Sequence, residues 1–384
     1  MAGYEGADHK NGAGTPLDMN ELSQHNALAR EDYLRLREFN IRTVRESIGW
    51  RLVELDGRFD FSLLESRARA AQELDIEVIW TLFHYGFPAD IDIFSDQLVE
   101  RFARYCGETA RYLSRFSDEP PIYSPINEIS FFTFAVCETA LIYPFTGSLH
   151  ERGHALKQNL VRAVIAGCDA IWQVDPRARI VHSDPVIHLI GGTEDYAESA
   201  EQYRNAQFEA WDMVAGTSEP ELGGSPKYLD LIGVNYYHSN QWEIPSHDRL
   251  HWHLGDPRRR PFRQILGEVY ARYGRPLFIS ETSHVGIGRG QWIKEIAEEV
   301  SAALRDGVPI EGICLYPIID RPDWDDFSHW HNSGLWDLSL TPEGIFDRVL
   351  CEPYAEDLRE AQRMVESPFR QSVALSTSEE ICQP

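Results

Sequence analysis

The sequence predicts an α/β fold, a single (β/α)8 barrel of the TIM-barrel type. The chain has 384 residues, 43% of them hydrophobic, which is enough for one large core. Short apolar runs typical of buried parallel strands alternate with segments of helical periodicity, and we find no internal repeat. Acidic side chains end some of these runs, where barrels carry their functional groups. We expect one barrel domain over residues 1–365 and a disordered tail over residues 366–384.

Strands and helices can be placed in order along the chain. The predicted strands cover residues 41–48, 77–83, 121–128, 179–183, 229–235, 276–281 and 312–316. The predicted helices cover residues 27–39, 61–74, 97–115, 153–174, 197–214, 262–273 and 291–305. In the helix over 153–174, apolar residues recur at helical spacing from Leu156 to Ile171. A long loop is expected between Glu128 and that helix.

A closed barrel of eight strands needs one more strand before the first helix. The only room for it is Met1 to Glu5. These residues are either the end of a first strand whose earlier part is missing or a floppy terminus, and the sequence does not choose between the two.

Composition narrows the classes of partner. Lys and Arg number 36 against 61 Asp and Glu, and the formal net charge of −25 opposes binding to nucleic acid or to anionic membranes. The six cysteines form no C-x-x-C pair, which is typical of reduced thiols. We see no signal-peptide pattern and no apolar run near the ~18 residues of a membrane span. We therefore expect a cytoplasmic protein, whose oligomeric state stays open.

Glu128 and Glu281 each end an apolar run that is predicted to be a buried parallel strand. A carboxylate at the rim of a sheet is costly to desolvate unless it is paired or has a chemical task. The two residues are too far apart in sequence to share a local element, so only a closed fold brings them together. Two such acids on different strands predict a catalytic pair.

Further polar residues lie in or directly after the predicted strands, where a barrel brings them to one mouth. They are Arg45, His84, Asn127, Asn235, Tyr236, Tyr237, Asp320, Asp323 and Trp324. Aromatic residues also crowd the loops, including Phe131, Phe134 and Trp242. Sugars present apolar C–H faces that stack on such rings, so a carbohydrate pocket fits, although loop packing explains about half of them equally well.

Five motifs in order along the chain resemble those of glycoside hydrolase family 1, the retaining β-glycosidases. Val44–Trp50 stands in the place of Y-R-F-S-I-S-W, Thr81–Pro88 resembles T-L-x-H-W-x-x-P, and Ser124–Ile129 resembles T-x-N-E-P. Ile232–Tyr237 matches I-G-x-N-Y-Y in full, and Ile279–Thr282 is similar to I-T-E-N. Each match alone is weak, but their order and spacing cover nearly the whole chain. The protein thus resembles a divergent member of this family.

The resemblance implies that Glu128 is the acid/base and Glu281 the nucleophile of a double-displacement reaction, a role that also suits two paired carboxyls on chemical grounds. Arg45 and Tyr237 would then lie beside Glu281. Asn127 would contact the sugar 2-hydroxyl.

The resemblance also implies a shell of residues around the sugar, and this is where the sequence departs from the family. His84 would bind a hydroxyl further round the ring. Tyr316 stands in the place of the tryptophan under the sugar, and Asp323 in that of the acid that grips the 4- and 6-hydroxyls. Glu5 takes the place of a glutamine that binds hydroxyls. Asn235 and Trp324 are expected to support the substrate or the acids.

These observations predict a β-glucosidase-like enzyme that hydrolyses β-glycosides of small carbohydrates with retention, without metal or organic cofactor. Histidines two apart, as in His251 with His253 and His329 with His331, lack a nearby acidic third ligand and do not indicate a metal site. Two alternatives stay open, a carbohydrate-binding barrel that has lost turnover and a transglycosylase. The sequence does not identify the glycone or the aglycone.

Overall fold

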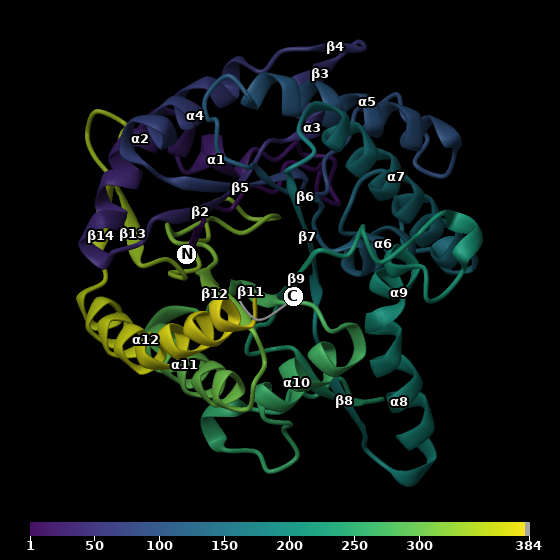
Figure 1. Ribbon diagram of the computed structural model, residues 1–384, viewed down its shortest axis with the longest axis vertical. Helices are drawn as coiled ribbons and strands as arrows, with labels where there is room; N and C mark the ends of the chain where they lie inside the picture. Colours follow the sequence, from purple (N-terminus) through teal and green to yellow (C-terminus); the bar gives the residue numbers. More distant parts are fainter. Residues whose placement is uncertain (381–384) are drawn as a thin grey trace.

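Parallel strands close into a barrel that helices surround (Figure 1). The computed structural model describes residues 1–380, and within them eight strands follow each other around the barrel in the order β1-β2-β5-β6-β7-β9-β11-β12. Their bounds are Ala2–Gly3, Thr43–Ser47, Glu77–Phe83, Ile122–Ile126, Arg179–Pro185, Leu231–Asn235, Leu277–Thr282 and Ile310–Leu315. The predicted (β/α)8 fold is confirmed.

The short strand β1 completes the barrel. Ala2 pairs with both β2 and β12, and Gly3 pairs with β2. The ring of Tyr316 lies against Gly3, where an added Cβ would come within 2.1 Å of Tyr316 Cδ2. The prediction of a strand within Met1 to Glu5 is therefore confirmed, and the alternative of a floppy terminus is wrong.

Helices pack around the outside of the barrel, as Figure 1 shows. Those from α1 to α6 cover Met19–Leu22, His25–Leu36, Trp50–Val53, Ser62–Leu74, Asp96–Leu113 and Ile129–Cys137. Those from α7 to α12 cover Gly153–Val174, Ala197–Asn205, Glu209–Ala215, Phe262–Tyr273, Arg289–Arg305 and Glu352–Glu380. In residues 1–380, no helix has the length and apolar content needed to cross a membrane.

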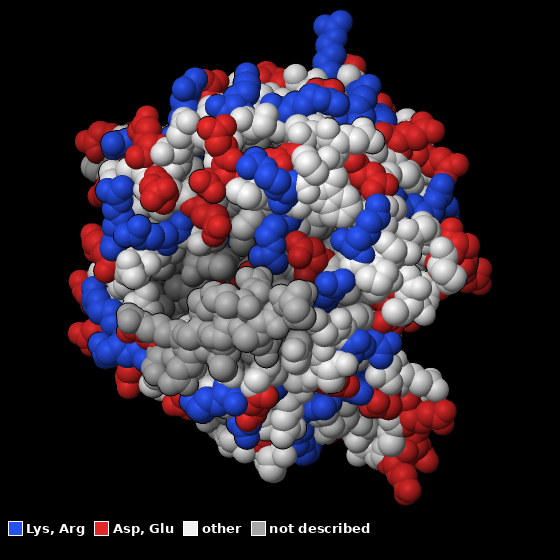
Figure 2. Space-filling view, viewed as in Figure 1, with Lys and Arg blue, Asp and Glu red and all other residues white. Residues whose placement is uncertain are grey.

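Smaller sheets lie outside the barrel. They pair β3 (Glu54–Leu55) with β4 (Arg58–Phe59), β8 (His188–Gly191) with β10 (Gln241–Ile244), and β13 (Trp336–Leu340) with β14 (Phe346–Leu350). Acidic and basic side chains are interspersed over the face seen in Figure 2, and acidic ones gather near the N-terminal end of α8. Exposed Glu194, Asp195 and Glu198 contribute to this acidic area.

Local sequence explains where helix α5 begins and which of its faces is buried. At the start of α5 the Ser95 side chain accepts a hydrogen bond from the backbone N–H of Gln97, which caps the helix. Leu98, Phe102 and Tyr105 then recur on one buried face.

The structure differs from the sequence prediction in two segments. The expected loop after Glu128 contains the helix α6, whose sequence Ile129–Cys137 is apolar nearly all round and so carries no helical period. Helix α12 continues to Glu380, into the segment 366–384 for which disorder was predicted. Phe369 packs against the core there. Residues 381–384 of that segment lie outside the described residues.

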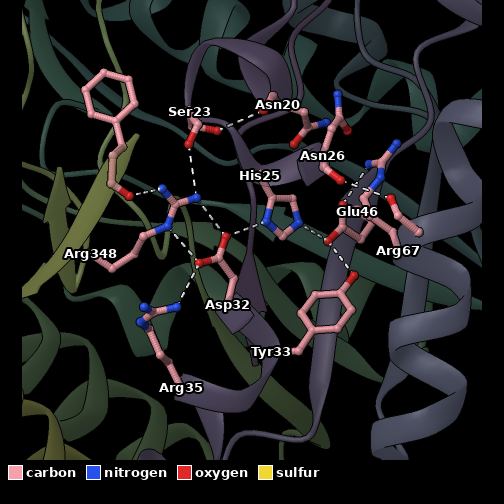
Figure 3. A network of polar contacts seen from close by, with 12 residues as sticks. Asn20, Ser23, His25, Asn26, Asp32, Tyr33, Arg35, Glu46, Arg67 and Arg348 are labelled. Carbon is pink, nitrogen blue, oxygen red and sulfur yellow. Dashed lines mark hydrogen bonds and ion pairs between the residues drawn. The ribbon is translucent and has the colours of Figure 1, made fainter. Parts of the chain in front are cut away.

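A buried network of charged side chains joins β2 to the helices outside it (Figure 3). His25 bridges two carboxylates, with Nδ1 2.9 Å from Asp32 Oδ2 and Nε2 2.8 Å from Glu46 Oε1. Arg67 donates to the other oxygen of Glu46 at 2.8 Å. Arg348, on β14, donates to Asp32 Oδ1 at 2.8 Å. The network thus connects β2, α2, α4 and β14.

The network fixes β2 from its outer side. Burial alone would raise the pKa of Glu46, but His25 and Arg67 outweigh it and lower that pKa to about 2. Because folding lowers this pKa, Glu46 stabilises the fold above the pKa of the unfolded chain, and the contribution is lost as the pH falls toward 2. Successive side chains of a strand point to opposite faces, so a fixed Glu46 directs Arg45 into the barrel.

We expect Arg348→Met to lower the free energy of unfolding by about 1.5–3 kcal/mol, because it removes hydrogen bonds from the buried carboxylate of Asp32, which keeps His25 and Arg35 as partners. Urea denaturation measures the effect. The matched control is Arg69→Met, which breaks an exposed pair with Glu65. Its effect should stay below about 1 kcal/mol. Equal losses in both variants would show that the buried network contributes no more than a surface pair.

Candidate active site

A cavity of about 810 Å³ lies where the barrel strands end. Residues at or just after the C-terminal ends of seven strands line it, namely Glu5, His84, Glu128, Pro185, Tyr237, Glu281 and Tyr316. The C-terminal ends of parallel strands meet at one mouth of a barrel, which explains why residues so distant in sequence share one cavity.

Glu281 is the second-last residue of β11 and is 4% exposed. Its Oε1 accepts a hydrogen bond from Arg45 Nη1 at 2.5 Å, and its Oε2 accepts one from the Tyr237 hydroxyl at 2.7 Å. Arg45 also donates to Asn127 Oδ1 at 2.6 Å and to Thr81 Oγ1 at 3.2 Å. Both oxygens of Glu281 are therefore held in place, and its charge is paired with a fixed guanidinium.

Glu128 follows β6 and is the residue before α6, with a left-handed backbone of φ 51°. Its Oε1 accepts a hydrogen bond from Asn235 Nδ2 at 2.8 Å, and its Oε2 accepts a short one from the Tyr85 hydroxyl. Burial and, next, the negative charge of Glu281 raise the pKa of Glu128 to about 8. At neutral pH this carboxyl is therefore mostly protonated.

Asn235 links the two acids. It lies opposite Glu281 in the pairing of β9 with β11. Its Oδ1 accepts a hydrogen bond from Ser280 Oγ at 2.5 Å, which turns the amide NH2 toward Glu128. The orientation of Glu128 thus depends on the strand that carries Glu281.

His84 and Asn127 continue the polar network beneath the cavity. Asn127 Nδ2 lies 3.2 Å from His84 Nε2 and donates to the Tyr85 hydroxyl at 3.0 Å. Burial and the nearby Arg45 charge hold the pKa of His84 well below its ordinary value, so the ring is neutral. With Nε2 accepting from Asn127, Nδ1 carries the proton and donates to Ser47 Oγ at 2.9 Å.

The residues predicted to surround the sugar divide into two groups. Tyr316 and Trp324 line the cavity, and the Arg45 guanidinium lies 5.2 Å from the centre of the Tyr316 ring. Asp323 is not among the described residues that line the cavity. Its Oδ1 instead accepts hydrogen bonds from the backbone of the following loop, and its Oδ2 lies 3.2 Å from His331 Nε2.

Sequence reasoning missed two site residues. Tyr85 stands in the motif Thr81–Pro88 where T-L-x-H-W-x-x-P has its tryptophan, and its hydroxyl donates to Glu128. Arg321 lines the cavity, and its Nε lies 3.2 Å from Glu5 Oε2. A single arginine in an irregular loop has no periodic signal, whereas the position of Tyr85 directly after His84 could have suggested a role.

Over residues 1–380, no three His, Cys, Asp or Glu side chains are grouped so that they could hold a metal ion.

Solved structures of β-glycosidases share this architecture. The β-glycosidase from Pyrococcus horikoshii is 17% identical, with 90% of this chain and 88% of that chain covered and a TM-score of 0.71. The chain has the fold of these enzymes. A β-glucosidase from Thermotoga maritima in complex with glucoimidazole is 14% identical, with 90% and 88% covered and a TM-score of 0.71. A family 1 β-glucosidase from the same organism is 14% identical, with 89% of this chain and 87% of that chain covered and a TM-score of 0.69.

The β-glycosidase fold agrees with the resemblance that the motifs predicted. Neither a protein-family model nor a curated protein sequence matches the chain. At 14–17% identity the agreement concerns the fold.

We expect Glu281→Gln to lower the pKa of Glu128 from about 8 by about one unit or more, because a neighbouring negative charge is removed while the burial remains. Carbon-13 NMR of protein labelled at the glutamate carboxyl carbons measures the titration. Glu138→Gln, which removes another acid lining the cavity, is the control and should leave that pKa unchanged. An unchanged pKa in Glu281→Gln would contradict the assigned coupling.

Proposed function

We propose that the protein is a divergent family 1-like β-glycosidase that hydrolyses β-glycosidic bonds with retention. One observation carries the proposal, the presence in one cavity of two buried carboxyls in opposite environments. Glu281 is paired with Arg45 and Tyr237, whereas burial and Glu281 raise the pKa of Glu128 to about 8. A retaining glycosidase needs one ionised nucleophile and one protonated acid.

In the first step, Glu281 attacks the anomeric carbon and forms an ester with it. The bond from that carbon to the glycosidic oxygen breaks, and Glu128 gives its proton to the departing oxygen. Asn127 accepts from Arg45 and donates to the Tyr85 hydroxyl, and so helps to fix the side chain that contacts Glu128. The fixed guanidinium prevents Glu281 from turning away from the reacting carbon.

In the second step, Glu128 removes a proton from water, the water oxygen bonds to the anomeric carbon, and Glu281 leaves as a carboxylate. Esterification of Glu281 abolishes the charge that contributes to the raised pKa of Glu128. The pKa of Glu128 therefore falls in the intermediate, which favours the deprotonated form that acts as base.

We further propose that Glu5 and Arg321 bind hydroxyls of the glycone, together with His84 and Trp324. Glu5 and Arg321 form an ion pair against the cavity, and such a pair offers an acceptor and a donor to neighbouring hydroxyls. Asp323 is excluded from this set by its position outside the cavity lining.

The function is tested with nitrophenyl β-glycosides of several sugars. We expect wild type to hydrolyse at least one of them, and Glu281→Ala and Glu128→Ala to lose about 10²–10⁴-fold or more in kcat. Azide should restore turnover of both variants with opposite stereochemistry, an α-glycosyl azide from Glu281→Ala and a β-glycosyl azide from Glu128→Ala. NMR of the products distinguishes them.

Several outcomes would count against the proposal. Binding of sugars without turnover would instead indicate a silent carbohydrate-binding barrel. Sugar transfer to added acceptors with negligible hydrolysis would indicate a transglycosylase. Azide products of reversed assignment would exchange the roles of Glu128 and Glu281.

The pH dependence follows from the raised pKa of Glu128. Because this group must be protonated, kcat/KM should fall as the pH rises through about 8. The Tyr85 hydroxyl stabilises the carboxylate form, so Tyr85→Phe should raise the pKa and move the alkaline limb to higher pH. Tyr143→Phe, an exposed tyrosine, serves as control. A limb that moves to lower pH in Tyr85→Phe would refute this sign.

A further inference from the structure

A second cavity, of about 260 Å³, lies beside the catalytic one. Its walls come from residues 9–10, 85–94 and 142–145 and from Arg51 on α3. Tyr85 lines both cavities, but the carboxyls Glu128 and Glu281 line only the catalytic one. The second cavity is therefore a separate site, which the proposed reaction does not use.

The walls of the second cavity are bonded to one another through the main chain. The backbone N–H of Tyr143 donates to the carbonyl of Lys10 at 3.0 Å, which joins the loop after α6 to the loop after β1. Arg51 donates from Nε to the carbonyl of Asp8 at 2.5 Å and from Nη2 to that of Leu17 at 2.6 Å. These bonds fix the cavity in the absence of a ligand.

His9 lines the second cavity without a hydrogen-bond partner. Its side chain is almost fully buried, and neither Nδ1 nor Nε2 is bonded to any group of residues 1–380. Burial and the charge of Arg51 lower its pKa to about 4, so the neutral ring has one N–H donor and one acceptor. Buried polar groups nearly always have partners, and an imidazole without one on a cavity wall points to a ligand that supplies it.

The ring of His9 is held by its aromatic neighbours. It meets the ring of Trp324 edge to face with centroids 4.8 Å apart, and that of Tyr85 with centroids 5.9 Å apart. The direction of its nitrogen atoms is thus set by packing before any ligand binds.

Two cations line the same cavity without an ion-pair partner in the described part of the chain. Arg51 bonds only to backbone carbonyls, which leaves its Nη1 free, and Lys10 has no carboxylate beside it. Acidic residues outnumber basic ones in this chain, whose formal net charge is −25. Two unpaired cations at one cavity therefore favour an anionic ligand.

The nearby acids do not cancel this charge. Asp8 lies behind the wall, where its Oδ1 accepts from the backbone N–H of Gly86 at 3.0 Å. Burial raises its pKa to about 7, so it carries only part of a negative charge at neutral pH. Asp92 lines the cavity, but it is exposed and its Oδ1 accepts from the backbone N–H of Phe94 at 3.0 Å. The groups lining the cavity keep a net positive charge.

The rest of the wall is apolar and largely aromatic. The rings of Phe94 and Phe145 meet edge to face with centroids 6.4 Å apart. Ile91, Ile93 and Ile142 are buried between the loops and also line the cavity. Such a wall suits a flat apolar body better than a hydrated inorganic anion.

We propose that the second cavity binds a small aromatic monocarboxylate, with its carboxylate against His9, Arg51 and Lys10 and its ring among the apolar side chains. The N–H of His9 and the free Nη1 of Arg51 donate to the carboxylate oxygens. A volume of about 260 Å³ lies just below the range that takes drug-sized ligands and suits a ligand with a single ring. Binding at this site requires neither a glycoside nor turnover.

Titration calorimetry with benzoate, benzamide and acetate tests the proposal on the wild-type protein. Benzamide keeps the ring and the shape but lacks the charge, whereas acetate keeps the charge without the ring. We expect benzoate to bind about 10-fold more tightly than either. No binding of benzoate, or equal affinity for benzoate and benzamide, would overturn the proposal.

Variants locate the bound carboxylate. Lys10→Met and His9→Phe should each weaken benzoate binding by roughly 3- to 10-fold. The control Lys227→Met removes an exposed lysine that is paired with Asp169, and it should leave the affinity unchanged. Arg321→Met removes a cation from the catalytic cavity and should also have no effect. Loss of binding in Arg321→Met, with Lys10→Met unaffected, would place the anion in the catalytic cavity and refute the second site.

A crystal structure of the wild-type protein with benzoate gives the same answer without any variant. We expect the carboxylate within hydrogen-bond distance of a ring nitrogen of His9. Benzoate found only in the catalytic cavity would contradict the proposal. Failure of the protein to hydrolyse any glycoside would defeat the proposed enzyme, whereas the calorimetry and the benzoate complex would still decide the second site.

Discussion

Arg45 on β2 and Glu281 on β11 form an ion pair inside the barrel, and the other polar groups of the cavity are arranged around it. A buried charge without its partner costs about 3–5 kcal/mol, so the two strands have to present these side chains together. The guanidinium also orients Asn127. On the outer face of β2, Glu46 is held by His25 and Arg67, which constrains the strand that carries Arg45 (Figure 3).

Glu128 differs from Glu281 in having no cation paired with it among the described residues. Its carboxyl faces a tyrosine hydroxyl and an amide, and it feels the charge of Glu281. Two chemically identical side chains therefore lie in opposite electrostatic surroundings. This arrangement fits the proposed two-step reaction. Loss of the Glu281 charge in the intermediate lowers the pKa of Glu128, and return of that charge raises it again.

The two ends of the cavity differ in chemistry. Around Glu5 and Arg321 it offers charged groups, which suit the hydroxyls of a sugar. Along α6 the rings of Phe131 and Phe134 line the cavity, and Lys157, which also lines it, is paired with Glu209. The helix α6 begins directly after Glu128, and residues on one of its faces line the cavity. Substitutions on this face of α6 can therefore change the lining of the cavity without changing the ion pair between Arg45 and Glu281.

The sequence by itself determined the barrel and the candidate acids, because strand and helix periods are local and strand ends converge in a closed barrel. The resemblance to family 1 added the expectation that Arg45 and Tyr237 lie beside Glu281. Only the tertiary structure decided that Tyr85 contacts Glu128, that Arg321 pairs with Glu5, and that Asp323 turns to its own loop. These contacts join irregular loops, whose paths depend on packing between distant segments. Helix α6 was not predicted because a helix that is apolar on nearly every side has no hydrophobic period to detect.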